Sequence, residues 1–432
     1  MTDVFAIKDY SFPKDFLWGS ATAAHQVEGN NIHSDSWFNE HKKLKMNPDY
    51  EVSGTACNHY NMYEEDAALL KDLGHQAFRL GVEWARIEPD EGVFLDSEAE
   101  HYVRELACLK EKGIQTFVTL VHFSLPKWFS DKGGFNSLDN LKYFEKYLNY
   151  ILPKISPYVD FWNVWNECNG DMTVDKFDFK FNAVIYHARG YHLIKQFSNK
   201  PVSSAISFVY MHAKRQNDVF DKTMEKYYDM ICHEYLLHAI RTGELVVPHK
   251  DGIFDREIKG TMDFWSVNSY TRNMVDARSA SLTCKRYPFS ETRMLPMNFY
   301  LDEFYPECIY HNLMRLTDKP IYITENGCSC HNDDFRMVYL AEYLCALNQA
   351  IKDGADVKGY LYWSFLDNYE WWTYIPKFGL VDVDRKNGFK RTPKPSAYFY
   401  RDIIRNNGFS QEILSKYLKE MPRVDRSMPI LK

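Results

Sequence analysis

Residues 77–123 contain the pattern that decides the fold: AFRLGVEWARI at 77–87, EAEHYVRELACLKEK at 98–112 and QTFVTLVHF at 115–123. The first and third runs are short, apolar and rich in aromatic or β-branched residues, which is typical of buried strands. The second run has apolar residues at helical spacing, and Gly113 follows it where a left-handed cap would end a helix. This stretch predicts a strand, a helix and a second strand.

The same alternation continues along the whole chain. Strands are predicted at residues 16–24, 77–87, 115–123, 160–165, 202–210, 264–270, 321–324 and 357–365. Helices are predicted at residues 60–73, 98–112, 138–155, 182–197, 223–240, 305–316, 334–352 and 395–406, and Gly74 and Gly354 follow two of them. Eight strands that are mostly apolar on both faces, each followed by a helix, predict an α/β protein with a single (β/α)8 TIM barrel.

Domain organisation follows from the absence of a linker, a repeat or a low-complexity tract. We expect one catalytic barrel over residues 1–409 and a C-terminal tail, residues 410–432, that docks on it or takes part in a homo-oligomer contact. Segments 170–179 and 272–304 are long or irregular, and both would lie on the face where such barrels keep their active sites.

Composition excludes several classes of protein. The chain has 432 residues with 52 Lys and Arg against 59 Asp and Glu, a net charge of −7 that disfavours a nucleic-acid binder. No basic patch precedes an apolar run at the amino terminus, and no apolar stretch has the length of about 20 residues that a membrane span needs. Nine scattered cysteines indicate reduced thiols, so we expect a cytoplasmic protein.

Three glutamates come at the ends of predicted strands: Glu83, Glu167 and Glu325. The carboxyl ends of barrel strands converge on one pocket, and two carboxylates that face each other there can cleave a glycosidic bond without a metal or an organic cofactor. Any one of these glutamates could equally be part of a structural ion pair. Spacing alone does not choose the working pair.

Other polar and aromatic residues at the same strand ends would surround the glutamates. Arg79 shares a side of its strand with Glu83 and could bind a neighbouring carboxylate. The remaining members of the ring are His25, Gln26, His122, Asn268, Tyr270, Trp363, Glu370 and Trp371. Because indoles can lie on the apolar faces of a sugar while amides, imidazole and carboxylate bind its hydroxyls, the ring suits a polyhydroxylated ligand. Aromatic residues make up 16 % of the chain; some must serve the core, but an excess of Trp and Tyr is also what stacking against sugar rings or bases requires.

These residues resemble glycoside hydrolase family 1, the retaining β-glucosidase and β-galactosidase family. The resemblance covers nearly the whole chain. It is carried by FPKDFLWGSATAAHQVEG (12–29), FRLGVEWARIEP (78–89), TLVHFSLPKWF (119–129), WNE (165–167), NSY (268–270), YITENG (322–327) and GYLYWSFLDNYEWWTYIPKFGLVDVD (359–384).

The resemblance implies a role for each matching residue. Glu167 would be the general acid/base and Glu325 the nucleophile, which leaves Glu83 a structural or local electrostatic role. The nucleophile would be supported by Arg79, Tyr270 and Asn268. Asn166 would bind the sugar 2-hydroxyl, and the other sugar contacts would come from Gln26, His122, Glu370 and Trp371, with Trp363 as the floor of the pocket.

Departures from the family pattern concern the leaving group. The motif after the third strand reads His122, Phe123, Ser124 in place of His, Trp, Asp, and Cys168 replaces the Pro that normally follows the acid/base. Segment 169–181 also looks shorter than its counterpart. Members that act on phosphorylated sugars carry Ser where this chain has Glu370, and a carboxylate would repel a phosphate. Lys377 is interpreted as a solvated or ion-paired loop residue.

The sequence therefore predicts a retaining, exo-acting β-glycosidase for unphosphorylated glucosides, galactosides or fucosides. The alternatives are a 6-phospho-β-glycosidase, a catalytically silent sugar-binding barrel, and an inverting hydrolase with carboxyl groups about 6.5–9.5 Å apart instead of about 5–5.5 Å. No cofactor is expected. Cys328, Cys330 and His331 lack a fourth ligand at a recognisable spacing, so we expect no metal. Residues Met224, Tyr227, Ile231, Tyr235 and His238 predict an amphipathic helix that packs on the barrel.

Overall fold

The computed structural model describes residues 3–169, 176–278 and 303–422. Eight parallel strands form a closed barrel in the order β10-β12-β13-β2-β3-β4-β5-β6. The barrel strands are β2 (Leu17–Ala21), β3 (Ala77–Gly81), β4 (Gln115–Thr119), β5 (Phe161–Asn166), β6 (Val202–Ser207), β10 (Trp265–Asn268), β12 (Ile321–Asn326) and β13 (Val357–Trp363). Each one coincides with a predicted strand, which confirms the single barrel.

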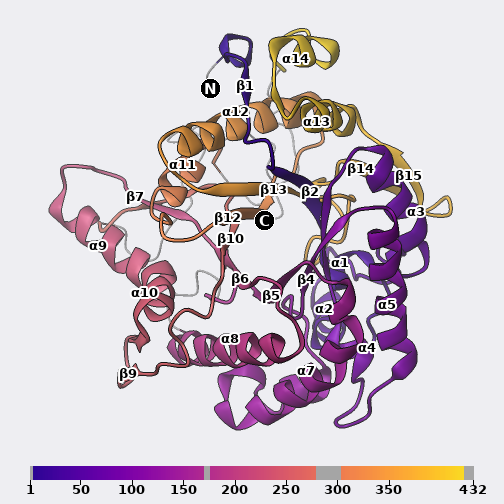
Figure 1. Cartoon of the computed structure of the whole chain (residues 1–432), viewed down its shortest axis with the longest axis vertical. Helices are drawn as coiled ribbons and strands as arrows, with labels where there is room; N and C mark the ends of the chain where they lie inside the picture. Colours follow the sequence, from indigo (N-terminus) through magenta and orange to yellow (C-terminus); the bar gives the residue numbers. More distant parts are fainter. Residues whose placement is uncertain (1–2, 170–175, 279–302, 423–432) are drawn as a thin grey trace.

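Helices surround this barrel (Figure 1). Those that overlap predicted helices are α3 (His59–Asp72), α5 (Asp96–Glu111), α7 (Leu141–Ile155), α8 (Phe177–Phe197), α9 (Val219–Asp229), α10 (Tyr235–Thr242), α11 (Glu307–Leu313), α12 (Asp333–Lys352) and α13 (Pro395–Asn406). Gly74, Gly113 and Gly354 have φ values of 77°, 72° and 109°, as their predicted cap positions require.

Shorter elements decorate the ends of the barrel. The short helices are α1 (Ala24–Val27), α4 (Trp84–Ile87), α6 (Lys127–Asp131) and α14 (Gln411–Tyr417), with 3-10 turns at Val4–Ala6, Gly134–Asn136, Leu138–Asn140 and Ser156–Tyr158. Four two-stranded sheets pair β1 (Tyr10–Ser11) with β16 (Gly408–Phe409), β7 (Tyr210–Ala213) with β11 (Arg272–Val275), β8 (Glu244–Leu245) with β9 (Ile253–Phe254), and β14 (Val381–Asp384) with β15 (Lys390–Pro393).

Several predicted boundaries are wrong. The strand predicted at 77–87 ends at Gly81, because Glu83 caps α4 by accepting a hydrogen bond from the Ala85 amide at 3.3 Å. The strand predicted at 202–210 divides into β6 and β7. Helix α2 (Asp35–Met46) was not predicted, since its buried residue is the polar Glu40 and no apolar periodicity marks it.

The helix predicted at 223–240 is interrupted by a π turn at Met230–Glu234 between α9 and α10. The wider turn changes which residues face the barrel. Ile231 and Tyr235 are buried as expected, whereas Tyr227 is 46 % exposed and His238 binds Glu244 at the surface. One amphipathic face therefore does not run through the whole segment.

The two predicted active-site loops are described only in part, because residues 170–175 and 279–302 lie outside the described residues. What is described is regular: α8 begins at Phe177, and the segment after β10 continues as β11. At the carboxyl end, α14 buries Ile413 and Leu414, and Gln411 donates to the carbonyls of Val4 and Ile7 at 2.9 and 2.8 Å. No helix in the described part of the chain combines the length and apolarity needed to cross a bilayer.

A buried charge network joins α3, α5 and β15 beside the barrel. His59 Nδ1 lies 2.7 Å from Asp66 and its Nε2 lies 2.8 Å from Glu105. Arg391 binds both oxygens of Asp66 at 2.7 Å. Burial lowers the pKa of His59, but Glu105 and Asp66 outweigh burial and raise that pKa to about 10. His59 is therefore a buried cation at neutral pH.

We expect His59→Gln to lower the free energy of unfolding by about 3 kcal/mol at pH 6, because the buried Glu105 carboxylate loses the charge of His59, whereas Asp66 keeps Arg391. The pKa of His59 is higher in the folded state than the ordinary 6.5. Its stabilising effect is thus complete below pH 6.5 and is lost as the pH rises towards 10. Urea unfolding of both proteins at pH 6, 8 and 10 measures the difference, and a gap that stays constant with pH would contradict this account.

Candidate active site

The carboxyl ends of the barrel strands enclose a cavity of about 590 Å³. Its lining consists of Gln26, Asp35, Ser36, Asn39, His122, Phe123, Asn166, Glu167, Ser207, Val209, Tyr270, Thr271, Glu325, Trp363, Glu370, Trp371, Trp372 and Phe378. Most predicted site residues are in this lining. Arg79 and Asn268 are buried next to it, where they hold lining residues in place.

Glu325 lies near the end of β12 and has two strong hydrogen-bond donors. Arg79 Nη1 forms a short ion pair with Glu325 Oε1, and the Tyr270 hydroxyl donates to Oε2 at 2.7 Å. Burial raises the pKa of Glu325 above its ordinary value, and the charge of Arg79 and the hydrogen bond from Tyr270 offset part of that rise. These two donors therefore favour the ionised carboxylate at a buried position.

Glu167 follows the last residue of β5 and lines the same cavity as Glu325. Its backbone has a φ of 52°, a left-handed conformation that costs an L-residue about 1–2 kcal/mol. Asn268 Nδ2 donates to Glu167 Oε1 at 3.3 Å and to Asn166 Oδ1 at 3.0 Å. Two carboxyl groups that are 158 residues apart in sequence (325 − 167) thus share one cavity. The Arg79 cation binds one of them, Glu325.

Two buried polar atoms at the cavity have no hydrogen-bond partner among the described residues: Gln26 Oε1 and His122 Nδ1. Asn166 Nδ2 lies 3.1 Å from His122 Nε2, and Asn166 Oδ1 is occupied by donors from Arg79 and Asn268. The Asn166 amide therefore donates to His122. Burial and the Arg79 charge hold the pKa of His122 well below its usual range, so its neutral ring carries the proton on Nδ1. Ligand hydroxyls could satisfy both buried atoms.

Aromatic rings form the floor and one wall. Trp363 is 4 % exposed, and its Nε1 donates to Glu370 Oε1 at 3.2 Å. Trp371 stacks on His25, with ring centroids 5.9 Å apart and an interplanar angle of 9°. His25 was expected in the ligand ring, but it is buried behind Trp371, where it lies 3.3 Å from Glu40. Its role is to support the indole.

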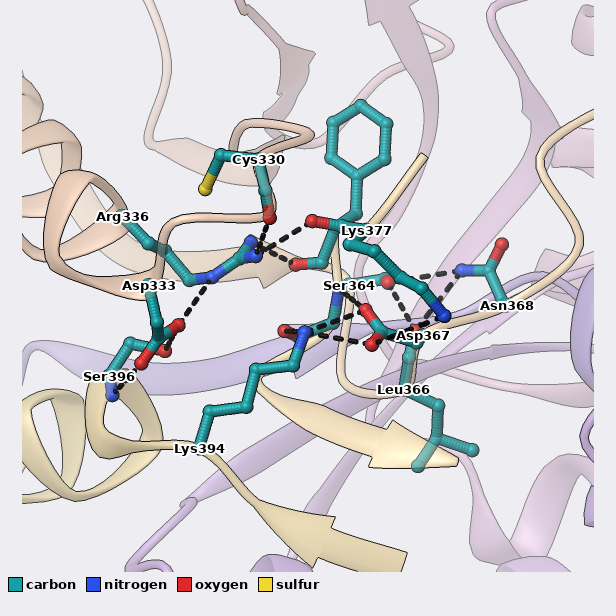
Figure 2. A network of polar contacts seen from close by, with 12 residues as sticks. Cys330, Asp333, Arg336, Ser364, Leu366, Asp367, Asn368, Lys377, Lys394 and Ser396 are labelled. Carbon is teal, nitrogen blue, oxygen red and sulfur yellow. Dashed lines mark hydrogen bonds and ion pairs between the residues drawn. The ribbon is translucent and has the colours of Figure 1, made fainter. Parts of the chain in front are cut away.

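The loop that carries Glu370 and Trp371 is anchored by Arg336 of α12 (Figure 2). The fully buried guanidinium donates to the carbonyls of Cys328 and Cys330, both at 2.9 Å, and to those of Lys377 and Phe378, both at 2.7 Å. Asp333 binds Arg336 at 3.0 Å. Arg336 therefore joins the segment after the Glu325 strand to the end of the Glu370 loop.

Asp367 anchors the start of the same loop (Figure 2). Its carboxylate accepts from Lys394 and from the Gly379 amide, both at 2.8 Å, and lies 3.8 Å from Lys377. Lys377 is thus ion-paired and does not line the cavity. Both ends of the loop are held by buried charges, so the positions of Glu370 and Trp371 depend on contacts outside the cavity.

The remaining candidates lie outside the lining. Glu83 accepts from Ser124 Oγ at 2.5 Å as well as capping α4, so it holds the segment after β4. Cys168 is buried. The sulfur atoms of Cys328 and Cys330 are buried and 3.6 Å apart. Within the described ranges, His, Cys, Asp and Glu side chains form no group of three that could hold a metal ion.

Sequence reasoning missed the contribution of α2 to the cavity wall. Asp35, Ser36 and Asn39 come from its first turns, and Ser34 caps the helix by accepting from the Trp37 amide at 3.1 Å. The Ser34 cap followed by an acidic residue was the one local signal for this helix.

Comparisons with known proteins agree with this geometry. The family model of glycosyl hydrolase family 1 matches residues 8–409. "Beta-glucosidase A" of Acetivibrio thermocellus is 29 % identical over 457 residues, covering 92 % of this chain and 99 % of the relative. The "6-phospho-beta-glucosidase GmuD" of Bacillus subtilis is 26 % identical, covering 93 % and 99 %. The solved structure of the "beta-glycosidase from Pyrococcus horikoshii" superposes with a TM-score of 0.86 at 32 % identity, covering 95 % and 98 %. The chain is therefore a glycoside hydrolase and belongs to glycosyl hydrolase family 1.

Proposed function

We propose that this cavity hydrolyses unphosphorylated β-glycosides from the non-reducing end by double displacement, with Glu325 as the nucleophile and Glu167 as the general acid/base. The glycone is glucose, galactose or fucose. The observation that carries the assignment is the set of donors on Glu325: the two carboxylates share one cavity, and Arg79 and Tyr270 both donate to Glu325. An anion held in this way is suited to attack, and the other carboxyl group is suited to carry a proton.

Both displacement steps depend on the charges of Glu325 and Glu167. Protonated Glu167 gives its proton to the glycosidic oxygen as that bond breaks, and Glu325 forms an ester with the anomeric carbon. Because the ester removes the negative charge of Glu325, the pKa of Glu167 falls and its carboxylate becomes the base. Glu167 then takes a proton from water, the water oxygen bonds to the anomeric carbon, and the ester breaks. The sugar leaves with its configuration retained.

Sugar binding in this proposal uses the buried polar atoms of the cavity. Gln26 Oε1 and His122 Nδ1 have complementary hydrogen-bonding roles, one as acceptor and one as donor. Asn166 is held by Arg79 and Asn268, which suits it to the 2-hydroxyl. Glu370 and Trp371 bind the outer hydroxyls, and the sugar lies on Trp363.

The rival substrate is a 6-phosphoglycoside. Glu370 contributes a carboxylate to the lining, and no Lys or Arg belongs to that lining in the part of the chain that the structure describes. A phosphate dianion would therefore meet charge of its own sign. We also propose that residues 1–409 form the catalytic unit and that the tail, expected at 410–432, docks on it through residues 410–422; residues 423–432 lie outside the described residues. The cytoplasmic location, a role in carbohydrate metabolism and a homo-oligomeric state stay predictions.

Glu325→Gln should abolish turnover of every glycoside, because the amide cannot form the ester. Glu167→Ala should lower kcat/KM by about 10²–10⁴-fold on substrates that need acid catalysis. Azide should restore activity to Glu167→Ala on aryl glycosides with good leaving groups and yield the β-azide, which NMR identifies. Wild-type rates in Glu325→Gln, or an α-azide product, would refute the assignment.

Removal of the Arg79 charge should move the acid limb of the kcat/KM profile to higher pH. The limb reports ionisation of the nucleophile, and Arg79 lowers the pKa of Glu325, so Arg79→Met takes away that effect. Tyr270→Phe should move the limb in the same direction by a smaller amount, and Arg79→Lys should restore it in part. Circular dichroism checks folding. A limb that stays in place, or moves to lower pH, would contradict the role of Arg79.

Discrimination against phosphate should depend on Glu370. We expect the plain 4-nitrophenyl β-glycoside to exceed its 6-phosphate in kcat/KM by about 100-fold or more, since like charges placed together cost several kcal/mol. Glu370→Ser should lower the ratio of kcat/KM for the plain glycoside to kcat/KM for the 6-phosphate, because it removes the repulsion between the Glu370 carboxylate and the phosphate. If the wild type preferred the phosphorylated substrate, the rival function would be correct.

A further inference from the structure

The backbone at Glu167 is strained, and the residues that follow it are firmly held. Glu167 has a φ of 52° and a half-buried side chain. A left-handed conformation of an L-residue persists only where the surrounding structure enforces it. The next two residues, Cys168 and Asn169, are 1 % and 3 % exposed, and the Cys168 amide donates to the Ala205 carbonyl of β6 at 3.3 Å. Their contacts therefore help to determine where the Glu167 carboxyl group lies.

The Asn169 side chain joins this segment to two others. Its Nδ2 donates to the carbonyls of Ser207, the last residue of β6, and of Cys232, both at 2.8 Å. Its Oδ1 accepts from the Ser207 amide at 3.0 Å. The amide nitrogen and oxygen are thus both engaged inside the protein. Asn169 therefore fixes the segment after β5 against the end of β6 and the helical region that contains Cys232.

The Asn169 carbonyl accepts two further hydrogen bonds from buried side chains. Lys180 of α8 donates through Nζ at 2.8 Å, and Tyr235, the first residue of α10, donates through its hydroxyl at 3.0 Å. These residues are 0 % and 2 % exposed, and Lys180 Nζ lies 5.5 Å from the centroid of the Tyr235 ring. A fully buried lysine is uncommon, because its ammonium group must be hydrogen-bonded to offset the loss of water. This position therefore calls for an explanation beyond packing.

The π turn at Met230–Glu234 brings part of this cluster to Asn169. Cys232, whose carbonyl accepts from Asn169, lies within the turn. The turn is itself anchored, because Arg315 binds the two oxygens of Asp229 at 2.9 and 2.8 Å. Turns of this kind are rare and are frequent at functional sites. The interruption between α9 and α10 thus supports the segment that carries Glu167.

We propose that Lys180 and Tyr235 are positioning residues for Glu167, and that through the Asn169 carbonyl they keep the acid/base carboxyl group within reach of the glycosidic oxygen. Neither side chain lines the cavity, so they act through Asn169 and not on the sugar. Proton transfer requires the acid within hydrogen-bond reach of the leaving oxygen, and a misplacement of about 1 Å can cost about 10²-fold in rate. This inference rests on the proposed function, which makes Glu167 the general acid/base.

The test compares two leaving groups on one sugar. Phenolate is a strong base that needs the proton of Glu167 as its bond breaks, whereas 2,4-dinitrophenolate leaves without it. In Lys180→Met, kcat/KM for the phenyl β-glycoside should fall about 100-fold, as expected for a misplaced acid. For the 2,4-dinitrophenyl β-glycoside it should stay close to the wild-type value. Tyr235→Phe should act in the same direction by about 3- to 10-fold, the size of one neutral hydrogen bond.

A second readout follows the same carboxyl group as a base. Release of the sugar from the Glu325 ester needs Glu167 to take a proton from water. For the 2,4-dinitrophenyl substrate, kcat and KM should therefore fall by the same factor in both variants, which leaves kcat/KM unchanged. A change that merely lowers the folded fraction reduces kcat without lowering KM. The split between kcat and KM thus separates positioning from stability.

Tyr400→Phe is the matched control for Tyr235→Phe. The Tyr400 side chain is 0 % exposed, and its hydroxyl donates to the Gly19 carbonyl of β2 at 2.8 Å. Its loss should change kcat/KM for the two substrates by the same factor and leave KM as it is. Circular dichroism checks folding. If Lys180→Met does not fold, Tyr235→Phe decides, because it keeps the ring and removes one hydroxyl.

Equal losses on the two substrates in Tyr235→Phe, or no loss on either, would overturn the positioning role. The same leaving-group dependence in Tyr400→Phe would overturn it as well. Glu167→Ala, measured alongside, separates these outcomes from failure of the proposed function. If its losses did not depend on the leaving group, Glu167 would not be the acid/base, and both proposals would fall together.

Discussion

The buried guanidinium of Arg79 is the constraint on which the site depends. It is 0 % exposed and lies on β3, yet its partners come from three other strands: Thr119 from β4, Asn166 from β5 and Glu325 from β12. A buried cation must be paired and hydrogen-bonded, because its desolvation is otherwise prohibitive. These partners meet only when the barrel closes. Folding and assembly of the carboxylate site are therefore one event.

The same cation determines how the two carboxyl groups differ. Arg79 and Tyr270 both donate to Glu325, and the neutral amide of Asn268 donates to Glu167. A charge next to one carboxylate separates the proton affinities of the pair, which is the condition for one to attack while the other carries a proton. Asn166 lies between the residues that contact the two glutamates, since it accepts hydrogen bonds from both Arg79 and Asn268. It also donates to His122.

The loop that carries Glu370 is held in place by charged residues that do not line the cavity. Arg336 joins four carbonyl groups from two segments, and Asp367 binds Lys394 (Figure 2). They hold the Glu370 loop as a rigid wall. The opposite wall, from α2, is held by backbone contacts with Leu125. The cavity thus has an inner end built from strand termini and an outer end built from loops and α2, and Phe123 belongs to its lining.

Sequence alone determined the barrel, because each strand is marked by a short apolar run and most helices by apolar residues at helical spacing, and both signals are local. It also determined that Glu167 and Glu325 follow strands whose ends must converge. Strand pattern could not separate Glu83 from this pair, because all three glutamates follow apolar runs. The family resemblance left Glu83 a structural or local electrostatic role, and its tertiary contacts are with Ser124 and the α4 amide. The position of α2, the burial of His25 behind Trp371 and the Asp35 contact with Leu125 were likewise decided by tertiary structure. All three depend on contacts between segments that show no apolar periodicity in the sequence. These segments come close to one another only after the barrel has closed.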